Sequence, residues 1–448
     1  MAPGHGMAES FDGHSPQKFL HHDTAPAPRV IKPLQDLIKI ARREARKPLD
    51  PTVFAFQELL ERDAELRQLS SSMFAEARKL ADSNYIHIDS VPVLMRLFNS
   101  ILSRAPAWID LDESYNLRGL PFNLVLMVLM STPSGRRLFQ NGTVNRHLKA
   151  ILSKWAVFLE SGASRYALNS SDGWLSPTAI AKLEDIANSA TPGENRCFTE
   201  IYQCPDEKDP SSLGFASWDD FFTRRFKPGV RPLPSPETLN SRQGAPIINA
   251  CESSPWKISH HCSLEEQFWL KGQPYSMADM LDNDPYVEHF VGGTVYQAYL
   301  SALSYHRWHA PISGIVKRIR YVEGNYFSHM PMLDPLAMEK SQGYLACAAI
   351  RALVFIEASD PRVGLICLVT IGMGEVSSCD AVVNEGDHVE AGDEIGTFHY
   401  GGSTHCLVFG GGVDVRFEHE RGGTRVSSAN VPVNSLLARC YSQEKSHL

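Results

Sequence analysis

No C-x-x-C pair occurs in this chain, although it contains nine cysteines. The cysteines are scattered along the sequence, at positions 197, 204, 251, 262, 347, 367, 379, 406 and 440. A zinc ribbon or a thioredoxin-like redox site needs closely spaced pairs, so the sequence predicts neither. We expect reduced and mostly buried thiols, as is usual for a protein of a reducing compartment.

Long apolar runs and an excess of positive charge are also missing. The most apolar stretch, Pro121–Met130, is too short to cross a bilayer and predicts a buried helix. The formal net charge of −8 argues against nucleic-acid binding and against a basic face for anionic lipid. Residues 1–30 resemble neither a secretory signal nor a transit peptide. We therefore expect a soluble cytoplasmic protein with a disordered tail at 1–30 and no integral membrane segment.

The sequence does contain a long region of helical periodicity. Residues 31–192 predict a helical N-terminal domain, in which apolar residues recur every three or four positions. Clear examples are Phe56–Leu66, Leu94–Leu102 and Leu148–Leu159. No cluster in this region suggests chemistry, so we interpret it as a scaffold or a lid.

The second half of the sequence has a different residue pattern. Residues 193–236 predict a linker that carries a docking helix, with Ser217 as its N-cap. Residues 237–448 contain short β-rich runs separated by glycine and proline, and they predict a catalytic domain. The fold class is therefore α+β. The stretch 383–396 is typical of a barrel-sandwich hairpin, but it lacks the exposed lysine of a lipoyl-type carrier.

The most informative motif is Gly401–Thr404, which follows a predicted turn and strand at 389–398. A serine hydroxyl can attack the carbonyl that precedes it when glycines allow a strained, exposed turn. Elimination and hydrolysis then leave a pyruvoyl group at the new N-terminus, and such a ketone serves as an electron sink. Gly-Gly-Ser alone more often marks a flexible turn, so this motif needs support from other residues.

Two histidines could provide that support. His306 and His309 lie three residues apart, with Arg307 and Trp308 between them, and suit proton transfer. They could also bind a metal, but no third ligand stands at a diagnostic spacing and no metal site is predicted. Glu252 follows an apolar strand-like run and could orient a histidine, or it could be a solvated turn residue.

The order of several segments resembles that of the phosphatidylserine decarboxylases, which are pyruvoyl-dependent. The resemblance covers the chain from about Ser217 to its C-terminus. The helical half is similar to an extension of fungal members, and the whole chain looks most similar to the fungal L-tryptophan decarboxylases of psilocybin biosynthesis. The segments that carry the resemblance are Ser217–Pro232, Tyr305–Pro311, Ile371–Val376 and Gly392–Thr404.

The resemblance implies self-cleavage between Gly402 and Ser403, with Ser403 becoming a covalent pyruvoyl cofactor. In this family pattern Ser403 matches the nucleophile, His309 the base for cleavage, and His306 the histidine of the decarboxylation step. The family has an aspartate followed by glycine near Glu252, where this chain has Glu252–Ser253. The two fragments, 1–402 and 403–448, are expected to remain associated.

We therefore expect a carboxy-lyase that decarboxylates a free aromatic L-amino acid. The favoured reaction is L-tryptophan to tryptamine in fungal secondary metabolism. The alternatives are a phosphatidylserine decarboxylase that makes phosphatidylethanolamine and an unprocessed scaffold protein. A metal-dependent hydrolase that uses His306 and His309 is a more distant hypothesis. Exposed strand edges would also permit a homodimer.

Overall fold

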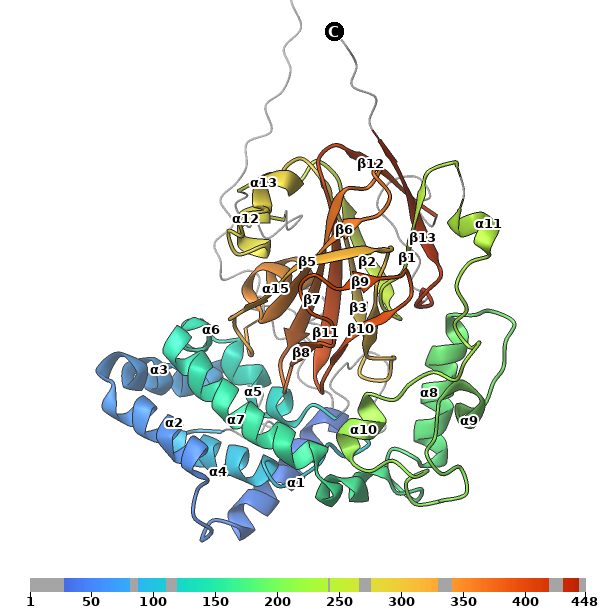
Figure 1. Ribbon diagram of the computed structural model, residues 1–448. Coiled ribbons are helices and arrows are strands. Elements are labelled where there is room, and N and C mark those ends of the chain that lie inside the picture. Colours follow the sequence, from blue (N-terminus) through green and yellow to red (C-terminus); the bar gives the residue numbers. More distant parts are fainter. Residues whose placement is uncertain are drawn as a thin grey trace, which may run out of the picture.

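The computed structural model describes residues 28–80, 88–109, 119–240, 242–265, 275–328, 341–418 and 430–442. The first 27 residues of the predicted tail lie outside these ranges. Helices of the N-terminal half gather in the lower part of Figure 1, and the strands of the C-terminal half stand above them. This arrangement confirms the α+β class.

Within its described ranges, the N-terminal half consists of helices joined by loops, and it contains no strand. Proline opens several of its helices, where the missing N–H costs nothing, and Asn141 caps α7 by accepting from the amides of Thr143 and Val144. The helices are α1 (Pro28–Arg43), α2 (Pro51–Arg62), α3 (Ala64–Leu80), α4 (Val91–Ile101), α5 (Pro121–Met130), α6 (Pro133–Gln140), α7 (Gly142–Glu160), the 3-10 helix η2 (Gly162–Leu168) and α8 (Pro177–Ser189).

Helix α5 is the central helix of this half. Every residue after Pro121 is buried, as its continuous apolar sequence predicts. Phe122 at its start packs edge-on against Phe98 of α4 and Trp155 of α7. In the ranges that the structure describes, no helix combines the length and the apolar character needed to span a bilayer.

Three short helices connect the two halves: α9 (Phe198–Ile201), α10 (Trp218–Phe222) and α11 (Pro236–Leu239). The hydroxyl of Ser217 accepts the amide of Asp220, so Ser217 caps α10. The aromatic side chains of α10 are buried, and the helix lies between the helical half and the strands in Figure 1.

The C-terminal half is built from three antiparallel sheets. The largest has the strand order β2-β3-β11-β7-β6-β5-β9, and the smaller ones have the orders β4-β10-β8 and β1-β13-β12. The strands are β1 (Ala245–Ile248), β2 (Ser254–Ser259), β3 (Thr294–Leu300), β4 (Arg307–His309), β5 (Gly314–Val322), β6 (Arg351–Ala358), β7 (Leu365–Met373), β8 (Cys379–Ala381), β9 (His388–Val389), β10 (Glu394–Phe398), β11 (Gly402–Phe409), β12 (Val413–Phe417) and β13 (Leu436–Ser442).

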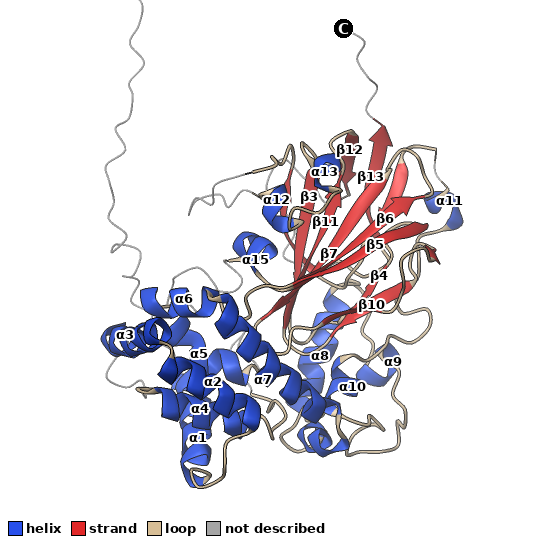
Figure 2. Cartoon of the chain, turned by 60° about the vertical axis from the view of Figure 1, so that its left-hand side comes forward, coloured by secondary structure: helices blue, strands red, loops and turns tan. Residues whose placement is uncertain are grey.

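Both faces of the large sheet are covered. Helices α12 (Met277–Met280), α13 (Val287–Phe290) and α15 (Gln342–Ala348) cover one face, and the two small sheets pack on the other (Figure 2). In β11, Cys406 and Val408 belong to the core under the helices, whereas Leu407 and Phe409 belong to the core between the sheets. Burial on both faces explains why this strand is apolar at consecutive positions.

Candidate active site

Ser403 lies at the start of the central strand β11. Its backbone pairs with Leu300 of β3 on one side and with Gly372 of β7 on the other. Only 1% of its surface is exposed. Because side chains alternate along a strand, Ser403 shares a face with Leu407 and Phe409 and points toward the core between the sheets. The hydroxyl of Ser403 is therefore shielded from bulk water.

A strained turn precedes Ser403. Gly401 has a φ of +150°, and a β-carbon there would lie 2.9 Å from Oγ of Ser377. Ser377 itself has a left-handed φ of 52°, is buried, and donates its hydroxyl to the carbonyl of Gly374. Left-handed conformations at residues other than glycine are costly and persist only where the surroundings enforce them. The turn therefore has the strain that the Gly-Gly-Ser motif predicts, but it is buried, not exposed as the sequence suggested.

His306 packs against the segment that leads to this turn. Its carbonyl accepts the amide of Phe398 at 2.8 Å, and its ring stacks on Phe222 with 3.9 Å between centroids. Phe222 also packs edge-on against Tyr400, three residues before Ser403. Thus His306 and the approach to Ser403 share one aromatic neighbour.

The imidazole of His306 is fully buried, and neither ring nitrogen has a hydrogen-bond partner of ordinary geometry among the described residues. Burial, together with the charge of Arg224, holds its pKa well below the usual value, although the backbone of Ser301 and Ser304 acts in the opposite direction. A buried polar group without a partner is costly. The lowered pKa therefore favours a neutral imidazole at this buried position.

His309 uses both ring nitrogens. Its Nδ1 lies 2.7 Å from the carbonyl of Gly392, and its Nε2 lies 3.0 Å from the hydroxyl of Tyr305. Because a carbonyl can only accept, Nδ1 carries the proton and Nε2 is the basic nitrogen. Burial lowers the pKa of His309, partly offset by the Gly392 carbonyl and Glu394. The ring is therefore in the form that can accept a proton.

Glu252 is bound to a different partner from the one the sequence suggested. Its carboxylate is 1% exposed and accepts two hydrogen bonds from Nε and one from Nη2 of Arg231, at 3.2, 3.0 and 2.5 Å. It also accepts the amide of Val433 at 2.9 Å. Since the hydrogen bonds of His309 go to Gly392 and Tyr305, the structure does not show Glu252 and His309 in contact.

The predicted segments nevertheless meet at one end of the large sheet. Ser403 pairs with Leu300, and the neighbouring Tyr299 pairs with Ser254, two residues after Glu252. The amide of His309 donates to the carbonyl of Ala250 at 2.8 Å, which ties β4 to the same place. These pairings link the segments through neighbouring strands, but the side-chain hydrogen bonds of His309 and Glu252 described above do not go to Ser403.

Comparisons with known proteins show to which family this chain belongs. The family model of phosphatidylserine decarboxylase matches residues 218–430, and a second model of the same description matches residues 50–183. Decarboxylase iboD of Amanita muscaria is 38% identical over 338 residues, which cover 72% of this chain and 92% of that protein. The chain belongs to the phosphatidylserine decarboxylase family. It is thus a carboxy-lyase, and both halves of the chain fall within the family's models.

Two further relatives are named L-tryptophan decarboxylase. The protein of Psilocybe cubensis is 34% identical over 368 residues, covering 79% of this chain and 78% of the relative. The protein of Psilocybe cyanescens is 37% identical over 327 residues, covering 69% and 70%. A phosphatidylserine decarboxylase proenzyme of Schizosaccharomyces pombe is 29% identical over 205 residues, or 46% of this chain.

Enzymes of the phosphatidylserine decarboxylase family use a pyruvoyl group that derives from a serine of their own chain. The surroundings of Ser403 fit such a group. The strained turn at Gly401 precedes Ser403. The two ring nitrogens of His306 are buried and have no hydrogen-bond partner of ordinary geometry among the described residues. Within the described residues, no group of three or more His, Cys, Asp and Glu side chains is arranged to hold a metal ion.

The sequence alone did not indicate several residues around this candidate site. Arg231 holds Glu252, Tyr305 covers the basic nitrogen of His309, and Tyr400 packs beside His306 through Phe222. Tyr305 stands inside the motif that includes both histidines, and Tyr400 directly precedes Gly-Gly-Ser. The positions of Tyr305 and Tyr400 next to these motifs could have indicated a role in the site. The residues that they contact lie too far away in sequence to be inferred.

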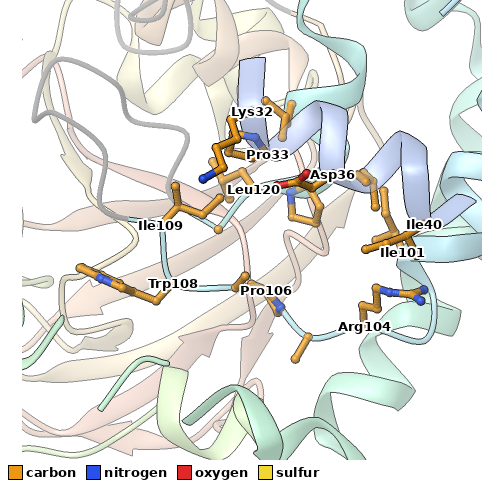
Figure 3. Close-up of a pocket in the computed structure, with 16 residues that line it drawn as sticks. Lys32, Pro33, Asp36, Ile40, Ile101, Arg104, Pro106, Trp108, Ile109 and Leu120 are labelled. Atoms are coloured by element: carbon orange, nitrogen blue, oxygen red, sulfur yellow. The ribbon is translucent and has the colours of Figure 1, made fainter. Parts of the chain in front are cut away.

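A cavity of about 700 Å³ lies in the helical half, and Gly119, whose carbonyl accepts the hydroxyl of Tyr400, contributes to its lining. Figure 3 shows its lining, which includes Lys32 and Asp36 of α1, Trp108 from the segment after α4, and Leu120 before α5. None of the predicted site residues contributes to the lining.

Proposed function

We propose that this member of the phosphatidylserine decarboxylase family decarboxylates a free aromatic L-amino acid, with L-tryptophan to tryptamine as the favoured reaction in fungal secondary metabolism. Two relatives named L-tryptophan decarboxylase match 79% and 69% of the chain. The decisive structural observation is Ser403, a buried serine at the start of the central strand directly after a strained glycine turn.

The proposal begins with self-cleavage. Oγ of Ser403 attacks the carbonyl carbon of Gly402, the peptide C–N bond breaks, and an ester replaces it. Loss of the α-proton of residue 403 then eliminates the carboxylate of Gly402. One water molecule hydrolyses the remaining dehydroalanine, releasing ammonia and leaving the ketone. His309, whose Nε2 is the basic nitrogen, is proposed to take the proton of the serine hydroxyl.

The ketone, once formed, supplies a carbonyl that condenses with the substrate amine and accepts the electrons left by CO2. This chain's residues hold and protonate the substrate. Because the nitrogen of residue 403 leaves as ammonia, the ketone oxygen takes its place on the side of Gly402, and the substrate is proposed to approach from that side. His306 and Phe222 are proposed to lie near this approach. As a neutral imidazole, His306 is proposed to accept the proton that the substrate ammonium releases on forming the imine, and to deliver it to the carbon that loses CO2.

The fold also supports continued association of the two fragments. The light fragment, 403–448, would contain β11, β12 and β13. Strand β11 lies between β3 and β7, and β13 pairs with β1, all three of which belong to the heavy fragment. Cleavage would therefore leave the sheets and their cores intact.

Intact-mass measurement of the purified chain tests the proposal. We expect fragments 1–402 and 403–448, the light one lighter by one ammonia than the product of plain hydrolysis. Ser403→Ala should give one uncleaved and inactive chain, whereas Ser359→Ala, at an exposed serine, should behave like the wild type. A wild-type chain that stays whole, as the scaffold hypothesis requires, or a Ser403→Ala chain that divides in two, would refute it.

Amine release identifies the substrate. We expect the purified enzyme to release tryptamine from L-tryptophan in preference to the amines of phenylalanine and tyrosine. Phosphatidylserine in detergent micelles is the direct competitor, because the family model and several more distant relatives carry that name. Phosphatidylethanolamine as the main product would assign the lipid reaction instead. His306→Ala should still divide into two fragments but lose turnover, and normal amine release would remove it from the mechanism.

A further inference from the structure

The bond between Gly402 and Ser403 has close neighbours from two chain segments. One is the approach to β11, residues 399–401, and the other is the loop after β7, residues 374–378. They are joined by backbone hydrogen bonds: the amide of Ser377 donates to the carbonyl of Tyr400 at 2.9 Å, and the amide of His399 donates to that of Ser378 at 3.0 Å. Anything that fixes one segment therefore also fixes the other.

Tyr400 extends from the first segment into the helical half. Its side chain is fully buried, and its hydroxyl donates to the carbonyl of Gly119, just before α5. Its ring packs edge-on against Trp155, Trp218 and Phe222, with centroids 5.6, 5.4 and 5.1 Å away. Burial raises the pKa of Tyr400 well above its usual value, so the phenol keeps its proton and remains a donor.

Glu375 extends from the second segment to the same helix. Its carboxyl is fully buried and accepts the amide of Asn123 at 2.9 Å, the side-chain amide of Asn123 at 3.2 Å and the amide of Phe122 at 3.4 Å. These amides belong to the first turn of α5, which has no intrahelical acceptors for them. Both segments beside the bond are thus attached to the chain between residues 119 and 123.

The attachment leaves little room for movement. A β-carbon at Gly119 would lie 2.9 Å from the hydroxyl oxygen of Tyr400 and 2.9 Å from the ring of Trp174. A β-carbon at Gly374, whose φ is +69°, would lie 2.3 Å from the side-chain nitrogen of Asn123. Glycine at these two positions allows the backbones of the two halves to approach each other.

We propose that the start of α5 positions the bond for self-cleavage, with Tyr400 as the principal positioning residue and Glu375 as the second. The helical half is thereby part of the processing machinery and acts through Tyr400 and Gly119 on the turn at Gly401. This inference rests on the self-cleavage proposed above. Intramolecular attack on an amide depends steeply on the placement of the reacting atoms, so loss of one anchor should slow it.

The test follows the division of the full chain after cell-free synthesis, sampled over time on gels. Tyr400→Phe retains the packed ring and removes only the hydrogen bond to Gly119. We expect cleavage to be about tenfold to 100-fold slower, the range that a small misplacement of reacting groups produces. The control is Tyr166→Phe, which also removes one hydroxyl hydrogen bond, accepted from the amide of Ala105, but leaves the bond between Tyr400 and Gly119 in place. It should cleave at the wild-type rate.

Hydroxylamine shows which step is affected. It cuts an accumulated ester at Gly402 to a hydroxamate, but it does not replace a serine attack that has not occurred. We therefore expect hydroxylamine to leave Tyr400→Phe slow. Restoration of the wild-type rate would mean that the hydroxyl acts after the attack, and it would overturn the positioning role.

Two outcomes distinguish this inference from the proposed function on which it rests. If the wild-type chain never divides, the proposed self-cleavage itself is wrong. If the wild-type chain divides and Tyr400→Phe divides equally fast, only the positioning role is wrong. Should Tyr400→Phe fail to fold, as judged by its thermal unfolding, Glu375→Asp provides a second test, because its shorter side chain loses the contact with Asn123. Wild-type cleavage in that variant would overturn the inference.

Discussion

Arg231 and Glu252 form an ion pair whose side chains are only 4% and 1% exposed. The pair connects the linker that follows α10 with the segment before β2, and the amide of Val433 completes the hydrogen bonds of the carboxylate. Breaking a buried ion pair leaves the remaining charge without compensation, which is far more costly than losing an exposed pair.

Arg231→Met should therefore lower the free energy of unfolding by about 3 to 5 kcal/mol, measured by urea denaturation of the Ser403→Ala chain. The matched control is Arg416→Met, whose pair with Asp414 is exposed, and it should cost much less stability than Arg231→Met. Glu252→Gln should cost a similar amount to Arg231→Met.

Combining Arg231→Met with Glu252→Gln then distinguishes pairing from independent roles. Because the two residues contact each other, the double variant should lose less stability than the two losses added together, by at least about 1 kcal/mol. Additive losses would show that Glu252 contributes through another partner, as expected if it orients His309 during cleavage.

The parts of this fold that follow local rules could be predicted from the sequence. Apolar spacing at Leu94–Leu102 and Leu148–Leu159 falls on α4 and α7, and the apolar run Pro121–Met130 has the bounds of α5. Ser403, His306 and His309 could be singled out because a Gly-Gly-Ser turn and closely spaced histidines have chemical meaning on their own.

The partners of those residues could not be predicted, because they depend on contacts distant in sequence. Tyr400 is 281 residues from Gly119, and Glu375 is 252 residues from Asn123. No periodicity or local propensity carries such information. The same holds for Glu252, where a carboxylate next to a strand gives no sign that Arg231 lies beside it.

Glu375 should make the stability of the fold depend on pH. Burial raises the pKa of its carboxyl to about 8, although the amides of Asn123 and Phe122 act in the opposite direction. The unfolded chain releases this proton near pH 4.5, so between pH 4.5 and 8 the folded chain holds a proton that the unfolded chain has lost. Stability attributable to this group therefore falls as pH rises through that window.

Glu375→Gln removes this dependence, because glutamine has no proton to lose. In the Ser403→Ala background, the variant should gain stability over its parent by a few kcal/mol as the pH is raised from 5 to 8, measured by urea unfolding at each pH. The control Glu288→Gln, at an exposed carboxyl, should show no such trend. A constant difference between parent and Glu375→Gln across this range would mean that Glu375 is ionised in the fold.

Gly401 should not tolerate a side chain. Its φ of +150° is disfavoured for other residues, and a β-carbon would lie 2.9 Å from Oγ of Ser377, which is held by the carbonyl of Gly374. Gly401→Ala is expected to cost about 1 to 3 kcal/mol of stability and to slow self-cleavage, since the turn must relax away from its strained form. Gly412→Ala is the control because nothing lies within 4 Å of its added carbon. Unchanged cleavage in Gly401→Ala would show that the strained turn is not needed.

The pH dependence of self-cleavage tests His309 as the base. Burial lowers its pKa below the usual 6.5, and a base must be unprotonated to accept a proton. The cleavage rate of the newly synthesised chain should therefore be independent of pH above about 6.5 and fall on acidification below it. His309→Ala should lose this step and cleave slowly at every pH. A rate that changes instead around pH 8 would point to Glu375, whose pKa is raised to about 8, and a rate that keeps rising with pH would point to direct attack by hydroxide.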